Sequence, residues 1–447
     1  MQKLIAKYGL AAHLAILAVA PLFLFPFFSD ETIAVVLLWL SLAAAGWVVL
    51  EPSVLVGDRL ADARLRVASA VVRDPLFWVL LFCAGLAGFR AVNSGISLSY
   101  NSEMNVWRLS PAVFPILPGS VGSSGFLPFA AIVALLVLLQ GMRHAMGRSA
   151  RTAFLLMSTA LAGAAAVVAH VAVIMGVPVS DVGFVFGLYL LAGVVALTSV
   201  MENGWYAMLP WMILALGGTG AALFSFAPIV VALSFSGAFI VLLVFSLVYS
   251  AHFLQSSGEF KQLLLVFAAL VLGAILVVAL LPKELLEARL DQYATFTAFS
   301  EDYKNVNAAL SRISFTTWIA HLWVGTGLSS FPLDFRFLAL PEEWALLPRG
   351  PLAVTNGWWL VLVERGVIGA VLFLLPAALL VVTYVQRLVE FFKTPDFPHP
   401  ACLLLPFVFG LFIALTFFGG SALRAEALMA TGVLSALSAS AFPRRKG

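Results

Sequence analysis

Charged side chains are scarce in this chain. Among its 447 residues only 11% are charged, with 25 Lys and Arg against 22 Asp and Glu, whereas 62% are hydrophobic. A water-soluble domain of this size cannot hide so much apolar surface. The net charge of +3 is small and no basic tract occurs, so nucleic acid is not expected as a partner. The composition excludes an ordinary soluble enzyme and favours a membrane protein.

Cysteine and the common cofactor motifs are also missing. Cys83 and Cys402 both lie in apolar runs, where they are expected to pack as small hydrophobic side chains rather than form a disulfide. The six histidines show no HxxxH or HExxH spacing, and no Asp-x-Asp pair occurs. A phosphate-binding P-loop and a GxSxG nucleophile elbow are absent as well. We therefore expect no metal, no cofactor and no ATP-driven work.

What the chain does have is long apolar runs, each of about 18 residues or more, the length of a helix that crosses a bilayer. The basic start and apolar run of the first 25 residues resemble a signal peptide, but no small-residue cleavage site stands out, and we read them as an uncleaved first helix. The predicted fold class is an all-α polytopic membrane protein. About twelve spans are expected, at residues 10–28, 33–50, 76–92, 125–141, 153–175, 182–200, 206–226, 229–250, 263–281, 358–385, 402–418 and 427–441.

Basic residues cluster in alternate connections, and this asymmetry predicts the orientation, because cytoplasmic loops collect Lys and Arg. With both termini cytoplasmic, the clusters fall inside: Lys3 and Lys7; Arg59, Arg64, Arg66 and Arg73; Arg143, Arg148 and Arg151; Arg387 and Lys393; Arg444, Arg445 and Lys446. Outside connections hold mainly Arg90, Arg108 and Arg424. We expect a multi-pass protein of the inner (plasma) membrane.

This orientation divides the chain into nine spans over residues 1–281, an outer, periplasmic loop over 282–356 and the last three spans over 357–447. A second outer segment, 93–124, is expected to lie along the membrane surface. Within the large loop, the stretch from Asn305 predicts a short helix, with Asn305 or Asn307 as its N-cap. Gly325 and Gly327 should stop that helix.

Four arginines lie in or beside the large loop, in otherwise apolar and aromatic sequence: Arg312, Arg336, Arg349 and Arg365. A guanidinium group binds phosphate or diphosphate oxygens through its planar fork. The alternative is that these arginines pair with neighbouring acids or touch lipid headgroups, the acids being Asp334, Glu342, Glu343 and Glu364. The residues alone leave both possibilities open.

The order of residues around this loop resembles the O-antigen ligase and O-antigen polymerase family. An Arg, a Trp, a Gly-x-Gly and a Phe come first, followed after the loop by an Asn, a Leu, a Glu and two glycines. Here they are Arg312, Trp318, Gly325, Gly327 and Phe331, then Asn356, Leu360, Glu364, Gly366 and Gly369. The specific part of the resemblance covers roughly an eighth of the chain.

The resemblance implies a metal-independent glycosyltransferase that takes a glycan from a polyprenyl diphosphate carrier at the outer membrane face. Its acceptor is a sugar hydroxyl of lipid A core or of another growing glycan. The further partners that the resemblance implies are membrane lipids and other polysaccharide-assembly proteins. Arg312 would bind the diphosphate, helped by Arg349 or Arg336. Asn356 and Glu364 would order the end of the loop and the start of the span that follows it. The alternative is that Glu364 acts as the base that deprotonates the acceptor hydroxyl, but the adjacent Arg365 is expected to hold it in an ion pair.

Two positions depart from the family pattern. Thr355 stands where the family has its histidine base, and Ser236 where an earlier span has an arginine. The alternative function is therefore a non-catalytic member that binds a carrier lipid or scaffolds an assembly complex. A transporter ranks last, because it would need ionisable residues near the bilayer midplane and most spans here lack charge.

Overall fold

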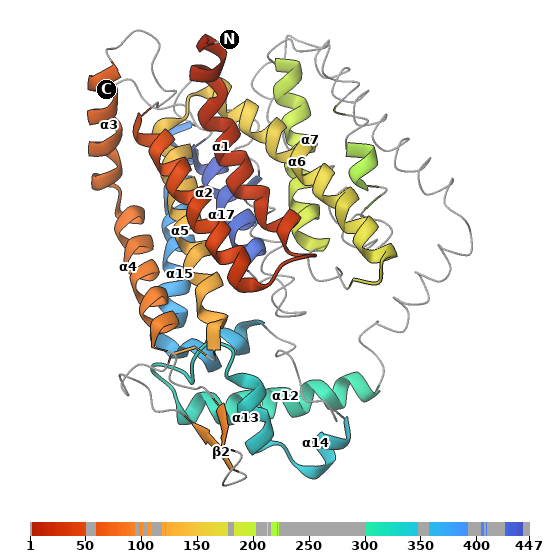
Figure 1. Ribbon diagram of the computed structural model, residues 1–447. Helices are drawn as coiled ribbons and strands as arrows, with labels where there is room; N and C mark the ends of the chain where they lie inside the picture. Colours follow the sequence, from red (N-terminus) through yellow and green to blue (C-terminus); the bar gives the residue numbers. More distant parts are fainter. Residues whose placement is uncertain are drawn as a thin grey trace.

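The computed structural model describes most of the chain, and the described residues form helices and one two-stranded hairpin (Figure 1). The described residues are 2–50, 60–93, 98–101, 106–109, 119–120, 122–177, 183–202, 301–346, 357–391 and 425–440, with the short pieces 212, 216–220, 222, 404–405 and 408.

The helices of the bundle are α1 (Gln2–Leu24), α2 (Asp30–Leu50), α3 (Leu60–Arg73), α4 (Pro75–Val92), α5 (Phe126–Gln140), α6 (Arg148–Ile174), α7 (Gly183–Glu202), α15 (Gly357–Phe391) and α17 (Ala425–Ser440). A 3₁₀ turn, η1 (Gly122–Gly125), precedes α5, and a π-helical turn, η2 (Gly141–Ala145), follows it. The remaining elements are α12 (Glu301–Ala320), α13 (Phe331–Leu338), α14 (Pro341–Leu346) and the antiparallel strands β1 (Leu98–Asn101) and β2 (Val106–Leu109).

Five of the described helices are long and apolar enough to cross a membrane: Asp30–Leu50, Pro75–Val92, Phe126–Ala145, Ala150–Ile174 and Gly357–Glu390. Two shorter apolar helices are Tyr8–Leu24 and Leu428–Ser438. These helices support the prediction of a helical membrane protein.

Eight of the twelve predicted spans coincide with described helices, namely α1, α2, α4, α5 with η2, α6, α7, α15 and α17. The predicted spans 229–250 and 263–281 lie outside the described residues, as do most of 206–226 and 402–418. The count of twelve and the placement of the large loop outside the membrane therefore stay predictions.

Small side chains are common in the buried part of the bundle. α1 packs along α6, which also packs on α7, and Ala162, Ala165 and Ala169 of α6 are buried. α2 and α4 pack on α5, and α17 lies between α5, α7 and α15. In Figure 1, α12, α13, α14 and β2 gather at one end of the bundle, and α3 and the first turns of α1 lie at the other.

A buried ion cluster joins α4 to η2 near the α3 end. The Asp74 carboxylate caps α4 by accepting from the Leu76 N–H (3.1 Å), and it also contacts Arg143 Nη1 (2.6 Å) and His144 Nε2 (3.0 Å). Burial alone raises the pKa of Asp74, but the His144 hydrogen bond, the charges of Arg143 and His144 and the Leu76 N–H together outweigh burial and leave that pKa lowered. Asp74 therefore holds the two helix ends together as a carboxylate.

Two local predictions were wrong, and one segment has structure that was not predicted. The fold is helical as predicted, and the segment expected to lie along the membrane surface contains the short β1–β2 hairpin. The second connection was expected only as a basic loop, yet residues 60–73 form α3, since Ala63 and Val67 recur at helical spacing and are buried. α12 begins at Glu301, so neither Asn305 nor Asn307 is its N-cap, although the helix does end before Gly325.

Candidate functional site

The centre of the site is a break in α15, where the chain meets the end of the loop that follows α12. Gly366 has φ 65° and ψ −173°, which interrupts the helix and frees backbone groups on both sides. The Thr326 N–H donates to the Val363 carbonyl (2.9 Å) and the Gly327 N–H to the Glu364 carbonyl (3.1 Å). In return, the N–H groups of Val367 and Ile368 donate to the carbonyls of Leu322 (2.9 Å) and Trp323 (3.1 Å). Loop and helix are thus joined through their backbones.

Glycine is required where these two segments cross. A Cβ on Gly325 would lie 2.5 Å from the Glu364 carbonyl carbon, and one on Gly366 would lie 2.4 Å from the Trp323 carbonyl carbon. Both glycines also have positive φ, at 71° and 65°. The glycine pattern noticed in the sequence therefore has a backbone cause that is independent of any catalytic role.

The same loop is tied to the bundle at the end of α4. Arg90 Nη2 donates to the Val324 carbonyl (3.1 Å), and Ser120 Oγ donates to the Arg90 carbonyl (3.3 Å). The Leu328 N–H bonds the Gly119 carbonyl (3.1 Å). These contacts position the loop against α4 and the segment that enters α5.

Charged side chains are buried beneath this junction. Glu364 is 8% exposed and its carboxylate accepts from the Ser329 backbone N–H. Arg365, Arg90 and Asp334 are its electrostatic neighbours. A buried carboxylate is tolerated when cations and hydrogen bonds surround it, and buried charges in membrane helices commonly mark functional sites.

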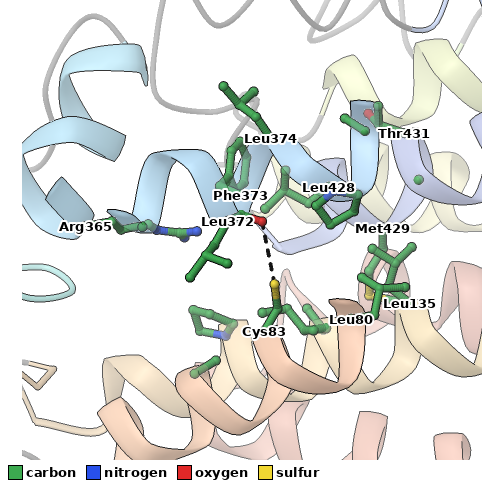
Figure 2. A pocket seen from close by; sticks show the side chains of 18 of the residues that line it. Leu80, Cys83, Leu135, Arg365, Leu372, Phe373, Leu374, Leu428, Met429 and Thr431 are labelled. Carbon is green, nitrogen blue, oxygen red and sulfur yellow. Dashed lines mark hydrogen bonds between the residues drawn. The ribbon is translucent and has the colours of Figure 1, made fainter. Parts of the chain in front are cut away.

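A cavity of about 420 Å³ opens beside these arginines, between α4, α5, α15 and α17. Its walls are mainly leucine and alanine side chains, with Phe373, and the arginines Arg90 and Arg365 also line it. Figure 2 shows Arg365 at one side of the cavity and Thr431 at the other, with Leu372 and Phe373 between them. Both a hydrocarbon chain and an anion therefore find matching surfaces in it.

The cavity is long as well as apolar. Its lining along α15 extends from Arg365 to Leu380, which corresponds to roughly 20 Å of helix at about 1.5 Å per residue. The lining also includes Cys83, whose thiol donates to the Leu372 carbonyl (3.6 Å) across the cavity (Figure 2). An extended chain fits this shape better than a compact polar molecule.

Both guanidinium groups have capacity to bind an anion. Arg90 is 5% exposed and its Nε has no hydrogen-bond partner among the described residues. The Arg365 guanidinium lies over the Phe373 ring, 5.1 Å from the centroid. A buried arginine nitrogen that lacks an acceptor is costly, and a phosphate oxygen would supply one.

Arg312, the residue that the sequence placed first, pairs with an acid instead. Its Nε and Nη2 donate to the two Glu343 carboxylate oxygens (2.8 and 2.5 Å), and Nη2 also donates to the Leu338 carbonyl (3.0 Å). The hydrogen bond from Arg312 lowers the pKa of Glu343, and the same bond raises the pKa of Arg312. This is the ion pairing that the sequence left open, and it joins α12 to α14.

The remaining predicted residues are scattered or undescribed. Arg336 is exposed in the last turn of α13. Thr355, Asn356, Arg349 and Ser236 lie outside the described residues, so their predicted roles stay predictions. The structure brings together Glu364 and Arg365, and it adds Arg90, which the sequence analysis counted only as a basic residue of an outer connection.

The chain matches no protein-family model, and no curated protein is significantly similar to it in sequence. Function therefore has to be argued from the site itself. Arg90 could have been found from the sequence by one signal, which is a lone charge inside the apolar run that forms α4.

Proposed function

We propose that this chain is a membrane glycosyltransferase of the O-antigen ligase or polymerase type, which transfers a glycan from a polyprenyl diphosphate carrier to a sugar hydroxyl. The observation that carries the proposal is the cavity between α4, α5, α15 and α17. It combines a long apolar wall with two guanidinium groups, and these are the two surfaces that a lipid diphosphate requires.

In this proposal the diphosphate binds Arg90 and Arg365, and the first prenyl units lie along α15. Fixed cations there would stabilise the negative charge that develops on the leaving diphosphate. In this proposal Arg312 does not bind the diphosphate but holds α12 against α14, because its guanidinium group already donates to both Glu343 carboxylate oxygens. Glu364 holds the loop in place through the Ser329 N–H and balances the two arginines.

A second candidate is a binding protein for the same carrier without transferase activity. Two positions favour it, because Thr355 and Ser236 replace the histidine and the arginine of the family pattern. A threonine has no side-chain pKa suited to a general base. The two candidates share the binding site and differ in whether the glycan leaves its carrier.

The binding step is tested with purified protein and a polyprenyl diphosphate. Arg365→Gln and Arg90→Gln are each expected to weaken binding by roughly tenfold or more, since a charge-assisted hydrogen bond contributes about 1.5–3 kcal/mol. Arg387→Gln is the matched control, because Arg387 pairs with Glu390 on the exposed side of α15. Equal affinity in all three variants and the wild type would show that the cavity does not bind the carrier.

The transfer step needs a separate measurement. Incubation with a glycan-charged carrier and a glycan acceptor should release the polyprenyl diphosphate and lengthen the acceptor. Carrier binding without release would identify the protein as the non-catalytic member. Absence of both binding and release would overturn both candidates.

A further inference from the structure

The second half of α12 has the wrong polarity for a helix in water. Ser314 and Thr317 are buried, at 0% and 3% exposure, whereas Phe315 and Ile319 are 48% and 55% exposed. Ser314 satisfies its hydroxyl by donating to the Leu310 carbonyl (2.6 Å). A helix packed on a protein in water would place its hydroxyls outward and its large apolar side chains inward.

The first half of the same helix has ordinary polarity. Ala309 and Leu310 are buried there, while Asn305 and Arg312 are exposed. Five exposed residues recur every three or four positions and form one stripe, namely Asn305, Ala308, Arg312, Phe315 and Ile319, while Thr316 and Ala320 are exposed beside it. The environment outside α12 therefore changes from polar to apolar along the helix, close to Phe315.

The apolar half of this stripe continues onto the membrane-crossing part of α15. Trp323, 63% exposed, follows Ile319 in the turn after α12, and its carbonyl accepts from the Ile368 N–H. Ile368 and Val371 are 49% and 57% exposed on α15, within the helix that is long and apolar enough to span a membrane. The turn after α12 therefore brings exposed apolar residues of α12 and α15 to one junction.

Aromatic rings cluster at the same level. Phe315, Trp318 and Trp359 lie with their ring centroids 6.0–6.1 Å apart, and Trp323, in the turn after the same helix, is exposed. Tryptophan is enriched where protein crosses from the lipid core to the headgroups, because its ring is apolar and its N–H is polar. In Figure 1, α12 lies across the end of the bundle, as a helix at a membrane surface would.

We propose that the exposed stripe formed by Phe315, Ile319 and Trp323 is inserted into the lipid headgroup region, and that α12 is an interfacial helix anchoring the α12–α14 unit to the membrane. The N-terminal half of α12, with Arg312, lies on the water side of that region. This inference concerns the lipid surface and holds whether or not the cavity binds a carrier.

The test measures the depth of single spin labels in vesicles of phosphatidylcholine and phosphatidylglycerol. Ile319→Cys and Phe315→Cys place labels on the apolar half of the stripe, in a chain that also carries Cys83→Ala and Cys402→Ala. Ala308→Cys is the matched control on the polar half of the same stripe, and Val371→Cys is the reference on α15. Collisions with oxygen, which enters lipid, are compared with collisions with a nickel chelate, which stays in water.

The label at Ile319→Cys should favour oxygen over the chelate severalfold more than the label at Ala308→Cys, and should approach the label at Val371→Cys. Phe315→Cys gives an independent reading near the level at which polarity changes. If the label at Ile319→Cys met the chelate as often as the label at Ala308→Cys, the stripe would lie in water and the proposal would be overturned. Shielding from both reagents would also overturn it, because protein, either a second copy or another chain, would then cover the stripe.

Discussion

The arginine side chains of this molecule differ in how many hydrogen-bond partners they already have. The Arg312 fork is filled by Glu343, whereas the Arg90 Nε is buried and lacks a hydrogen-bond partner among the described residues. The hydrogen bonds that a guanidinium group already makes limit those it can donate to a phosphate. For this reason the proposed function gives the anion-binding role to Arg90 and Arg365 rather than to Arg312.

The sequence predicted the region of the site and two of its three central residues. Glu364 was singled out by its place in the family pattern and Arg365 as one of four arginines in apolar and aromatic sequence, and the structure has Glu364 buried and Arg365 half-buried at the junction. Arg90 was overlooked, because its contact with the Val324 carbonyl joins positions 234 residues apart. The pairing of Arg312 with Glu343 likewise depends on how α12 and α14 fold back on each other, which no local pattern specifies.

Glu343→Gln should lower stability at neutral pH and reduce its dependence on acid. The folded-state pKa of Glu343 lies below its ordinary value of 4.5, so its contribution is complete above about pH 5 and is lost as pH falls through the folded-state pKa. Because the Arg312 side chain is 42% exposed, we expect a loss of only about 1 kcal/mol. Thermal unfolding of both proteins at pH 7 and pH 4 measures this.

Glu342→Gln is the control, since Glu342 is the exposed neighbour in the same turn. It should leave both unfolding curves close to those of the wild type. An equal effect of the two substitutions would mean that net charge, not the ion pair, controls the acid dependence.

Helices and turns were predicted unevenly. Membrane-crossing helices were found with ends close to the observed ones, because a long apolar run is a strong local signal; predicted span 76–92, for example, is α4 at Pro75–Val92. The Gly366 break was not predicted, because it lies inside an apolar helical run and is stabilised by the distant Leu322–Gly327 loop. The inside-out half of α12 was invisible for the same reason, since burial there depends on α13 and α15.

Gly366→Ala should weaken the junction between the loop and α15. Alanine at this position would combine an unfavourable positive φ with a Cβ 2.4 Å from the Trp323 carbonyl carbon, so a loss of about 1–3 kcal/mol is expected. Gly85→Ala is the matched control, because Gly85 is helical in α4 and a Cβ there meets nothing within 4 Å. Thermal unfolding of the two variants in the same detergent compares them.

Protease digestion gives a second reading of this prediction. If the loop separates from α15, cleavage between Trp323 and Leu340 should become faster in Gly366→Ala than in Gly85→Ala. Equal cleavage and equal unfolding temperatures would show that α15 can straighten at Gly366 without cost.

At the scale of the whole molecule, charge and architecture agree on two distinct ends. α3, which carries Arg64, Arg66 and Arg73, lies at one end of the bundle, and α12–α14 lie at the other (Figure 1). The inward-facing end of a membrane protein collects basic residues, so the α3 end is predicted to be cytoplasmic. The proposed function requires the same orientation, because its glycan donor is used at the outer face.

Reporter fusions test this orientation directly. A reporter joined after Gly350, next to the α12–α14 unit, should be located outside, whereas reporters joined after Gly147, between η2 and α6, and after Gly447 should be located in the cytoplasm. Alkaline phosphatase, active only outside, and a fluorescent protein, fluorescent only inside, give opposite readouts at each position. A reporter after Gly350 in the same compartment as the other two would contradict the orientation, and with it the access of an outer-face glycan donor to Arg90 and Arg365.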